Sequence, residues 1–335
     1  MSTRSKTDKV LKAIERKLGA NYKKSAKGVY KSWQKYMTEA EKKLTPFEKA
    51  YSAAKASGDK DAIRKAGAAL SKAKKEVTLQ NDNYKQMLNG VTRNMASVNQ
   101  TAVEYVNGQM SEIYLMNFDA DDIAAELKKV PAHFGLVDKA TVKKRIMDGD
   151  IKLPKRQLAI PKDMAWNTKQ INSSVLQGIL QGEGMDKIAA RLLPIINNNT
   201  GAAIRNARTL VTQTENGGRQ DRYKQLKDDG VVLKKVWIAT ADDRTRESHL
   251  ELDGVEVDVD DVFPNGLEYP GDPNGEPEEV YNCRCTMQTH VVGFVAEDGH
   301  IEYVEQVEEE ESLHDEQIEK EKEKRDEKKR SKNRG

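Results

Sequence analysis

Apolar side chains near the start of the chain recur every three or four residues, which is the period of an α-helix. They include Val10, Leu11, Ile14 and Leu18. Residues 57–59 have the sequence Ser-Gly-Asp, which is typical of a turn between antiparallel helices, and no proline occurs over residues 59–116. The pattern predicts an elongated, coiled-coil-like helical hairpin over residues 1–130.

The middle of the chain combines a connector with further helices. A short helical stretch near residues 141–147 ends at a turn signal at Gly149. Over residues 161–226 the helical period returns, with interruptions. The apolar face of the last helix consists of Ala203, Ile204, Ala207, Leu210 and Val211. Residues 131–228 are therefore predicted to form the connector and a second helical group.

The pattern changes at Gly230, after which β-branched residues alternate with others in the run V-V-L-K-K-V-W-I. A short helix, a loop rich in proline and glycine over residues 263–279, and a strand within residues 281–295 follow. The two strands are expected to pair, giving a small, loop-rich α+β module over residues 229–300. The charged tail, residues 301–335, is predicted to be disordered or a lone helix in solvent. The predicted fold class is mainly α with a small C-terminal α+β module.

Composition limits the kind of protein this can be. The chain has 335 residues, of which 37% are apolar and 33% charged, and it is too polar for one dense core. Its apolar runs are far shorter than the ~20 residues of a membrane-spanning helix, and its start lacks the apolar stretch of a secretory signal. We therefore expect no membrane partner and no export. Cys283 and Cys285 lie too close in sequence for an ordinary disulfide, which favours a reducing compartment.

Charge is distributed unevenly along the chain. Residues 1–110 contain 23 Lys and Arg against 10 Asp and Glu, whereas residues 242–319 contain 3 against 25. A basic helical front fits nucleic acid or an acidic protein, and phosphate would repel the acidic segment. Basic side chains are also common on helix faces that only meet solvent, and this is the alternative interpretation.

Three short motifs stand in the C-terminal part of the chain. They are W-I-A-T-A-D-D-R-T-R-E-S-H-L-E-L-D-G over residues 237–254, Y-P-G-D-P over residues 269–273, and N-C-R-C over residues 282–285. Together with an upstream helix that carries a Thr-Glu pair at residues 214–215, their order resembles the phage head morphogenesis family, the Mu F-like minor capsid proteins. The positions that carry the resemblance are Trp237, Asp242, Arg244, His249, Asp253, Gly254, Pro270, Gly271, Asn282, Cys283, Arg284 and Cys285.

This resemblance implies a minor capsid protein of a tailed bacteriophage. It implies a place in the virion, in the head interior or at the portal vertex, and in the host cytoplasm during assembly. The implied partners are the portal protein and a capsid or scaffold protein, and the implied roles are head assembly and genome delivery. The alternative function is non-specific binding of double-stranded DNA by the basic N-terminal helices.

Enzymatic activity is not expected from the sequence. Some members of the family carry a toxin or transferase domain after the module, whereas only the charged tail follows it here. The sequence also contains no G-x-S-x-G, Walker or H-E-x-x-H motif. We therefore predict that the chain has no enzymatic role, with a metal-dependent enzyme as the remaining alternative.

The motif residues include potential metal ligands. If the N-C-R-C segment is extended, Cys283 and Cys285 point to the same face. His249, with Asp253 one helical turn later, would then complete a four-coordinate structural zinc site. The single residue between the cysteines differs from the spacing of common zinc fingers. Two buried thiols beside a hydrogen-bonded pair of His249 and Asp253 are the alternative.

Overall fold

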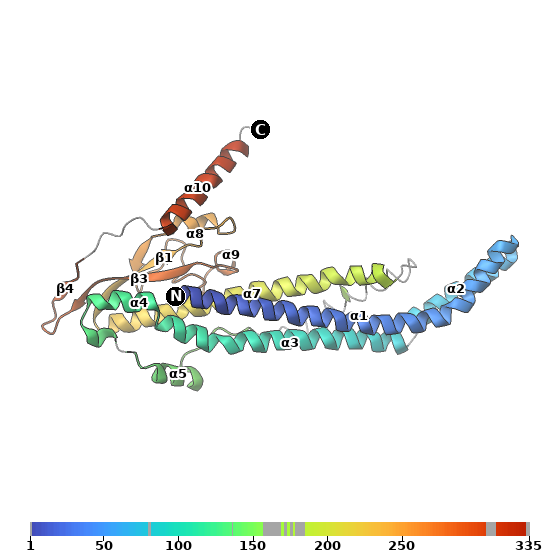
Figure 1. Ribbon diagram of the computed structural model, residues 1–335, viewed down its shortest axis with the longest axis horizontal. Coiled ribbons are helices and arrows are strands. Elements are labelled where there is room, and N and C mark those ends of the chain that lie inside the picture. Colours follow the sequence, from blue (N-terminus) through green and yellow to red (C-terminus); the bar gives the residue numbers. More distant parts are fainter. Residues whose placement is uncertain are drawn as a thin grey trace. The chain divides into compact units, whose positions relative to one another are not determined.

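The computed structural model describes residues 2–79, 82–135, 137–156, 169–170, 173–174, 177, 185–305 and 313–332 (Figure 1). The chain forms two compact units: unit 1 consists of Met1–Glu15, Tyr105–Arg156 and Ile204–Gly335, and unit 2 of Arg16–Glu104 and Gln157–Ala203. Each unit is discontinuous because three long helices run through its boundaries, namely α1 (Thr3–Ser57), α3 (Asp82–Phe118) and α7 (Met185–Asp228). None of the described helices has both the length and the apolar character needed to cross a bilayer.

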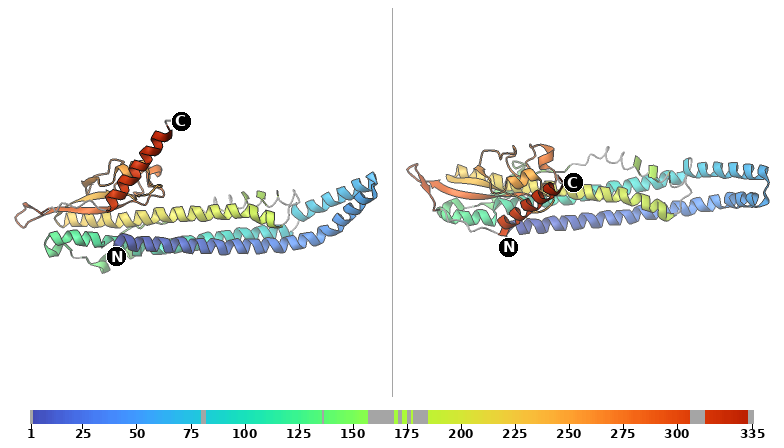
Figure 2. Two further views of the ribbon diagram at one scale, coloured as in Figure 1. Left: turned by 45° about the horizontal axis from the view of Figure 1, so that its top comes forward. Right: turned by 90° about the horizontal axis from the view of Figure 1, so that it is seen from above.

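A tight turn in unit 2 joins α1 to α2 (Lys60–Leu79). Gly58 adopts a φ of 72° in this turn, which glycine reaches without steric cost. Asp59 Oδ1 accepts hydrogen bonds from the backbone N–H groups of Asp61 (2.9 Å) and Ala62 (3.2 Å), which caps the start of α2. The turn reverses the chain direction, so that α1 and α2 form a helical hairpin (Figure 2).

Polar contacts and a buried apolar stripe join the helices of unit 2. Tyr36 Oη on α1 donates to the carbonyl oxygen of Val77 on α2 over 3.0 Å, and Tyr22 Oη donates to Asn99 Oδ1 on α3 over 2.5 Å. The buried apolar side chains near these contacts include Leu18, Val29, Val91 and Met95. The helical period in the sequence therefore marks the faces through which α1 and α3 pack together.

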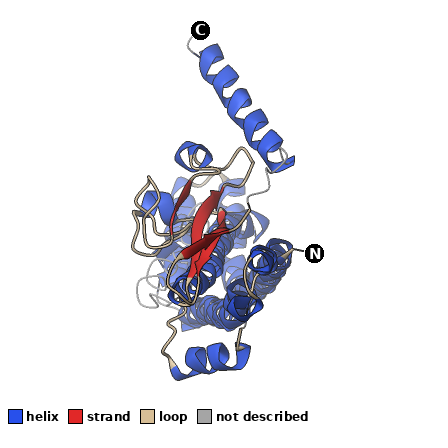
Figure 3. Ribbon diagram, turned by 90° about the vertical axis from the view of Figure 1, so that its left-hand side faces the viewer, coloured by secondary structure: helices blue, strands red, loops and turns tan. Residues whose placement is uncertain are grey.

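Unit 1 contains a four-stranded antiparallel sheet with the strand order β2-β1-β3-β4 (Figure 3). The strands are β1 (Val231–Ile238), β2 (Glu256–Asp258), β3 (Thr286–Val295) and β4 (Ile301–Tyr303). The two long strands, β1 and β3, pair from Val231 opposite Phe294 to Ile238 opposite Thr286. The predicted pairing is present, and the mainly α fold class with a small C-terminal α+β module is confirmed.

The core of unit 1 lies between the sheet and the C-terminal part of α7. It includes Tyr223, Leu226, Val231, Leu233, Trp237, Met287 and Val291. The short helix α4 (Asp121–Glu126) adds Ile123 to this core. Glu126 Oε2 accepts a hydrogen bond from the backbone N–H of Val291 over 2.9 Å. The helices and the sheet of unit 1 therefore share one apolar interior.

Lys235 lies on the buried face of β1 and anchors the loop that follows β2. Its Nζ donates to the carbonyl oxygens of Val259 (2.9 Å) and Glu268 (2.7 Å). Burial lowers the pKa of Lys235 to about 8. These bonds explain how a loop rich in proline and glycine is held in place without a regular element.

The connector contains α5 (Lys139–Asp148), where the sequence predicts a short helix. Asp138 Oδ1 accepts hydrogen bonds from the backbone N–H groups of Ala140 (3.0 Å) and Thr141 (3.2 Å) and caps its start. Gly149 ends the helix with a φ of 86°. Most of the helical pattern predicted over residues 161–180 lies outside the described residues.

Part of the charged tail forms helix α10 (Leu313–Lys332), where the sequence predicts disorder or a lone helix in solvent. One face of α10 packs on the module. Ile318 is 2% exposed, and Arg325 Nη2 donates to the carbonyl oxygen of Asp242 over 3.0 Å. These two residues are seven positions apart, so they lie on the same side of the helix. Residues 306–312 of the predicted tail lie outside the described residues.

Candidate functional site

One histidine and two cysteines converge at the core of unit 1. His249 lies on α8 (Glu247–Glu251), and both cysteines lie between α9 (Pro277–Val280) and β3. His249 Nδ1 is 3.5 Å from Cys283 Sγ and 3.5 Å from Cys285 Sγ. The three side chains are buried, with exposures of 1%, 2% and 2%. The structure thus brings together three of the four ligands predicted from the sequence.

The other ring nitrogen of His249 faces a carboxylate. His249 Nε2 is 2.8 Å from Glu279 Oε2. The same carboxylate group accepts hydrogen bonds from Ser248 Oγ (3.2 Å) and from the Asn265 side-chain amide (3.4 Å). Trp237 meets the imidazole edge-on, with 5.1 Å between ring centroids. A neutral His249 that donates from Nε2 directs its Nδ1 lone pair at the two sulfur atoms.

The two thiols shift each other's pKa in opposite directions. A hydrogen bond from Cys283, assisted by the neighbouring His249, lowers the pKa of Cys285. The same hydrogen bond, together with burial, raises the pKa of Cys283. The backbone N–H of Cys285 also donates to Cys283 Sγ over 3.4 Å.

Asp253, the fourth predicted ligand, does not join this cluster. Its Oδ1 accepts a hydrogen bond from the backbone N–H of Ala239 (2.7 Å) and lies 3.1 Å from His314 Nε2. The backbone N–H of Gly254, whose φ is 75°, donates to the carbonyl oxygen of Trp237 over 2.9 Å. Asp253 and Gly254 therefore fix the turn beside the end of β1, and the aspartate is a structural side chain.

Asp242 and Arg284 form an ion pair next to the cluster. Arg284 Nη2 donates to Asp242 Oδ1 over 2.6 Å, and Arg284 Nη1 donates to Oδ2. The Arg284 guanidinium holds the pKa of the Asp242 carboxyl well below its usual range. The backbone N–H of Arg244 also donates to Asp242 Oδ1 over 3.0 Å. These bonds join the segment after β1 to the N-C-R-C segment.

Polar side chains of α7 bind the backbone of the motif loops. Thr212 Oγ1 donates to the carbonyl oxygen of Cys283 over 2.7 Å. Asn216 Nδ2 donates to the carbonyl oxygens of Cys285 (3.1 Å) and Pro270 (3.0 Å). Sequence reasoning missed both donors. Polar side chains are common on the buried face of this part of α7, and Thr214, Glu215 and Gln220 are further examples. The sequence therefore offered no pattern that singled out Thr212 and Asn216.

Two motif positions have left-handed backbone conformations. Asn282 adopts a φ of 60°, which asparagine tolerates better than most residues, and its N–H donates to Thr209 Oγ1 over 2.9 Å. Gly271 adopts a φ of 84°, and a Cβ atom there would lie 3.1 Å from Thr212 Cγ2. Glycine at position 271 therefore satisfies both the backbone conformation and the close approach to α7.

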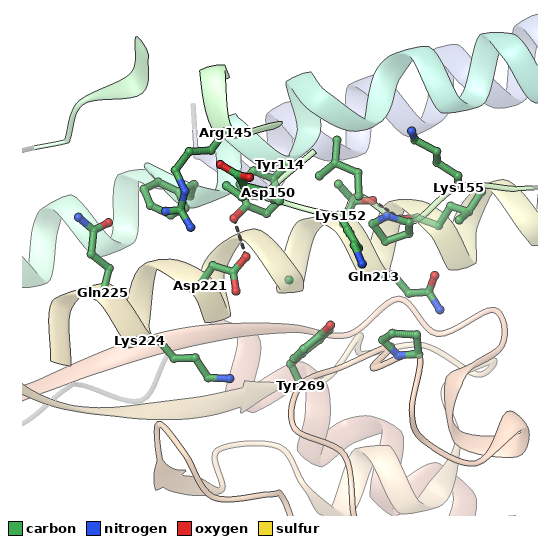
Figure 4. A pocket seen from close by; sticks show the side chains of 18 of the residues that line it. Tyr114, Arg145, Asp150, Lys152, Lys155, Gln213, Asp221, Lys224, Gln225 and Tyr269 are labelled. Atoms are coloured by element: carbon green, nitrogen blue, oxygen red, sulfur yellow. Dashed lines mark hydrogen bonds between the residues drawn. The ribbon is translucent and has the colours of Figure 1, made fainter. Parts of the chain in front are cut away.

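A cavity of about 760 Å³ lies elsewhere in unit 1, between α3, the region after α5, α7 and the Tyr269 loop (Figure 4). On its wall, Tyr114 Oη donates to Asp221 Oδ2 over 2.6 Å, and burial raises the pKa of both groups. Its charged lining residues are Arg145, Lys152, Lys155, Lys224, Asp150, Asp221 and Asp228. This mixture of charges favours no single class of ligand.

The family of the module follows from the comparison with known protein families. Residues 169–288 match the family described as Phage Mu protein F like protein. The match contains β1, α8 and the N-C-R-C segment, which are the elements that meet at the site. The α+β module is therefore similar to the Mu F-like proteins in the segment that carries the site. This match over residues 169–288 confirms the resemblance to the Mu F-like proteins that the motifs carry.

Three curated proteins are similar to this chain. Minor head protein GP7 of Bacillus phage SPP1 is 24% identical over 200 residues, which cover 59% of this chain and 65% of that protein. Uncharacterized protein YqbB of Bacillus subtilis (strain 168) is 27% identical over 132 residues, 37% of this chain and 42% of that protein. No solved structure gives a significant match.

A third relative corrects the expectation that the chain has no enzymatic role. NAD(+)--arginine ADP-ribosyltransferase EFV of Enterococcus faecalis (strain ATCC 700802 / V583) is 33% identical over 148 residues, which cover 44% of this chain and 30% of that protein. The absence of familiar catalytic motifs therefore did not justify excluding an enzyme. The chain spans less than two thirds of the length of each curated relative described here.

The contribution of the ion pair of Asp242 and Arg284 to stability can be tested by substitution. Asp242→Asn removes a charge from the pair, and we expect it to lower the free energy of unfolding by about 1–3 kcal/mol at pH 7. Because the folded pKa of Asp242 is depressed, its contribution is full above the unfolded value of about 3.9 and is lost as the pH falls below it. Urea unfolding at pH 7 and pH 3 measures both effects.

The matched control for this substitution is Asp243→Asn, because Asp243 is exposed and adjacent in sequence. We expect the control to change the free energy of unfolding by less than about 0.5 kcal/mol. Equal effects of the two substitutions at pH 7 would contradict the assigned role of Asp242.

Proposed function

We propose that this protein is a minor head protein of a tailed bacteriophage that joins the virion at the portal vertex. In this proposal it contacts the portal protein, and a capsid or scaffold protein, while the head assembles in the host cytoplasm, and it takes part in genome delivery. The observation that carries the proposal is the family match over residues 169–288. The similarity to Minor head protein GP7 supports it.

The outer part of the hairpin in unit 2 is the surface we assign to the head contact. This hairpin tip, residues 41–75, contains ten Lys and Arg against four Asp and Glu. Most of its side chains are exposed, and Phe47 is 40% exposed. A basic, alanine-rich helix pair with an exposed aromatic ring suits an acidic groove on a partner protein.

The division of the chain determines how this contact should be tested. Deleting residues 1–130 would also remove parts of unit 1, because Met1–Glu15 and the chain from Tyr105 onward belong to that unit. A cleaner variant replaces residues 47–69 with a Ser-Gly-Asp turn, the turn sequence that α1 and α2 already use. This change shortens both helices of the hairpin and leaves unit 1 intact.

We expect the shortened variant to lose co-purification with the portal, capsid or scaffold protein encoded beside its gene, because the outer part of the contact surface, with Phe47 and five of its ten Lys and Arg, is removed. The measurement is co-expression of each head protein with the tagged full chain, followed by affinity purification. Lys320→Gln with Lys322→Gln, on α10, is the control and should retain binding. If the shortened chain keeps the partner while circular dichroism shows it folded, the assigned surface is wrong.

Non-specific binding of double-stranded DNA is a second candidate function. It is favoured by the 23 Lys and Arg against 10 Asp and Glu in residues 1–110. Phosphate contacts release counterions, so the affinity of the full chain should fall steeply between 50 and 200 mM salt, as is typical of such binding. Fluorescence anisotropy with a labelled duplex measures this, and absent or salt-insensitive binding would remove the candidate.

ADP-ribosyl transfer to arginine is a third candidate, favoured by the similarity to the Enterococcus faecalis transferase. The alignment covers 30% of that protein, so the activity is a question for experiment on this chain. Incubation with labelled NAD⁺ and an arginine-containing acceptor tests it directly. Transfer of label to the acceptor would establish the activity, and no transfer would remove the candidate.

A further inference from the structure

The cluster of His249, Cys283 and Cys285 has the donor set of a metal site. Its three donor atoms lie within 4.8 Å of one another and are buried. We propose that the cluster binds one Zn²⁺ ion through His249 Nδ1 and the two thiolates. This inference is independent of the proposed head function, because it concerns how the module is held together and not what the module contacts.

The distances between the donor atoms fit a tetrahedral metal. With Zn–N of about 2.0 Å and Zn–S of about 2.3 Å, a nitrogen and a sulfur ligand lie about 3.5 Å apart. His249 Nδ1 is 3.5 Å from each sulfur atom. One nitrogen lone pair accepts one S–H hydrogen bond, whereas a shared cation places the nitrogen at equal distances from both sulfurs. The equal spacing therefore favours a metal over a single thiol–imidazole hydrogen bond.

The surroundings of His249 match those of zinc-binding histidines. Such histidines usually donate their other ring N–H to a carboxylate, which fixes the tautomer and the ring orientation. Glu279 Oε2 occupies this position, 2.8 Å from His249 Nε2. Ser248 and Asn265 in turn donate hydrogen bonds to the Glu279 carboxylate. The chain thus supplies a carboxylate–histidine pair whose free nitrogen faces two sulfurs.

The revised ligand set differs from the one that sequence spacing suggested. Asp253 is engaged by the backbone of Ala239, so the described residues supply three ligands and leave the fourth position to a small ligand such as water. Because the three protein ligands are at most 2% exposed, a larger substrate cannot reach the metal. The metal would therefore cross-link α8 to the N-C-R-C segment, a structural role.

Zinc content of the purified full chain is the direct test. The chain is prepared under reducing conditions with added Zn²⁺, freed of excess metal, and measured by inductively coupled plasma mass spectrometry. We expect about one zinc per chain, near zero for the Cys283→Ser, Cys285→Ser double variant, and full content for Asp253→Asn. Glu279→Gln should bind zinc about 10–100-fold more weakly, because it loses the carboxylate behind the histidine.

Two further measurements keep the test decisive if the cysteine variant fails to fold. Substitution of Co²⁺ into the wild-type chain should produce thiolate-to-cobalt charge-transfer absorption, which reports sulfur ligands without mutation. A chelator should also lower the melting temperature of the wild-type chain. Wild-type protein without zinc, a disulfide between the two cysteines under reducing conditions, or loss of zinc from a folded Asp253→Asn variant would overturn the proposal.

Discussion

The hydrogen bonds from buried side chains of α7 to the backbone of the N-C-R-C segment hold the site together. Residues 282–285 precede β3 and have no strand partner of their own, so their buried carbonyl groups need other donors. Thr212 and Asn216 supply these donors from one face of α7. A buried carbonyl left without a partner costs about 1–3 kcal/mol, so these bonds fix where both cysteines stand relative to α7. His249 on α8 can meet the two sulfurs only because that position is fixed.

Much of the fold could be predicted from the sequence, because helices and strands show in the local period of apolar residues. The alternation of residue types over residues 231–238 predicted strand β1. Because Cys283 and Cys285 are two positions apart, both thiols were predicted on one side of the chain, where they meet His249. Features that depend on contacts between residues far apart in the sequence could not be predicted. The Asp253 carboxylate could bind a metal, but its Oδ1 accepts a hydrogen bond from the backbone N–H of Ala239. The alternation places Lys235 on the buried face of β1, where a charged side chain is unusual. Two loop carbonyl oxygens accept hydrogen bonds from its ammonium group.

Ion pairs within unit 1 neutralise part of the uneven charge along the chain. The acidic stretch over residues 242–319 suggests a strong external field, yet several of its carboxylates have partners in the same chain. Arg284 pairs with Asp242, and Lys329 on α10 pairs with Glu247. A tail that composition alone assigns to solvent therefore provides counter-charges to the module. The hairpin tip contains ten Lys and Arg against four Asp and Glu, and this excess of positive charge is why we assign that surface to a partner.

The central claim, that α7 fixes the N-C-R-C segment through buried polar side chains, is tested most directly by the free energy of unfolding of Asn216→Ala. Asn216 is fully buried and donates to Pro270 and Cys285, so its truncation should lower the free energy of unfolding by about 1–3 kcal/mol. The same truncation at the exposed Asn274 should change it by less than about 0.5 kcal/mol. Urea unfolding of the full chain provides the measurement, and an Asn216→Ala variant as stable as the Asn274→Ala control would contradict the account.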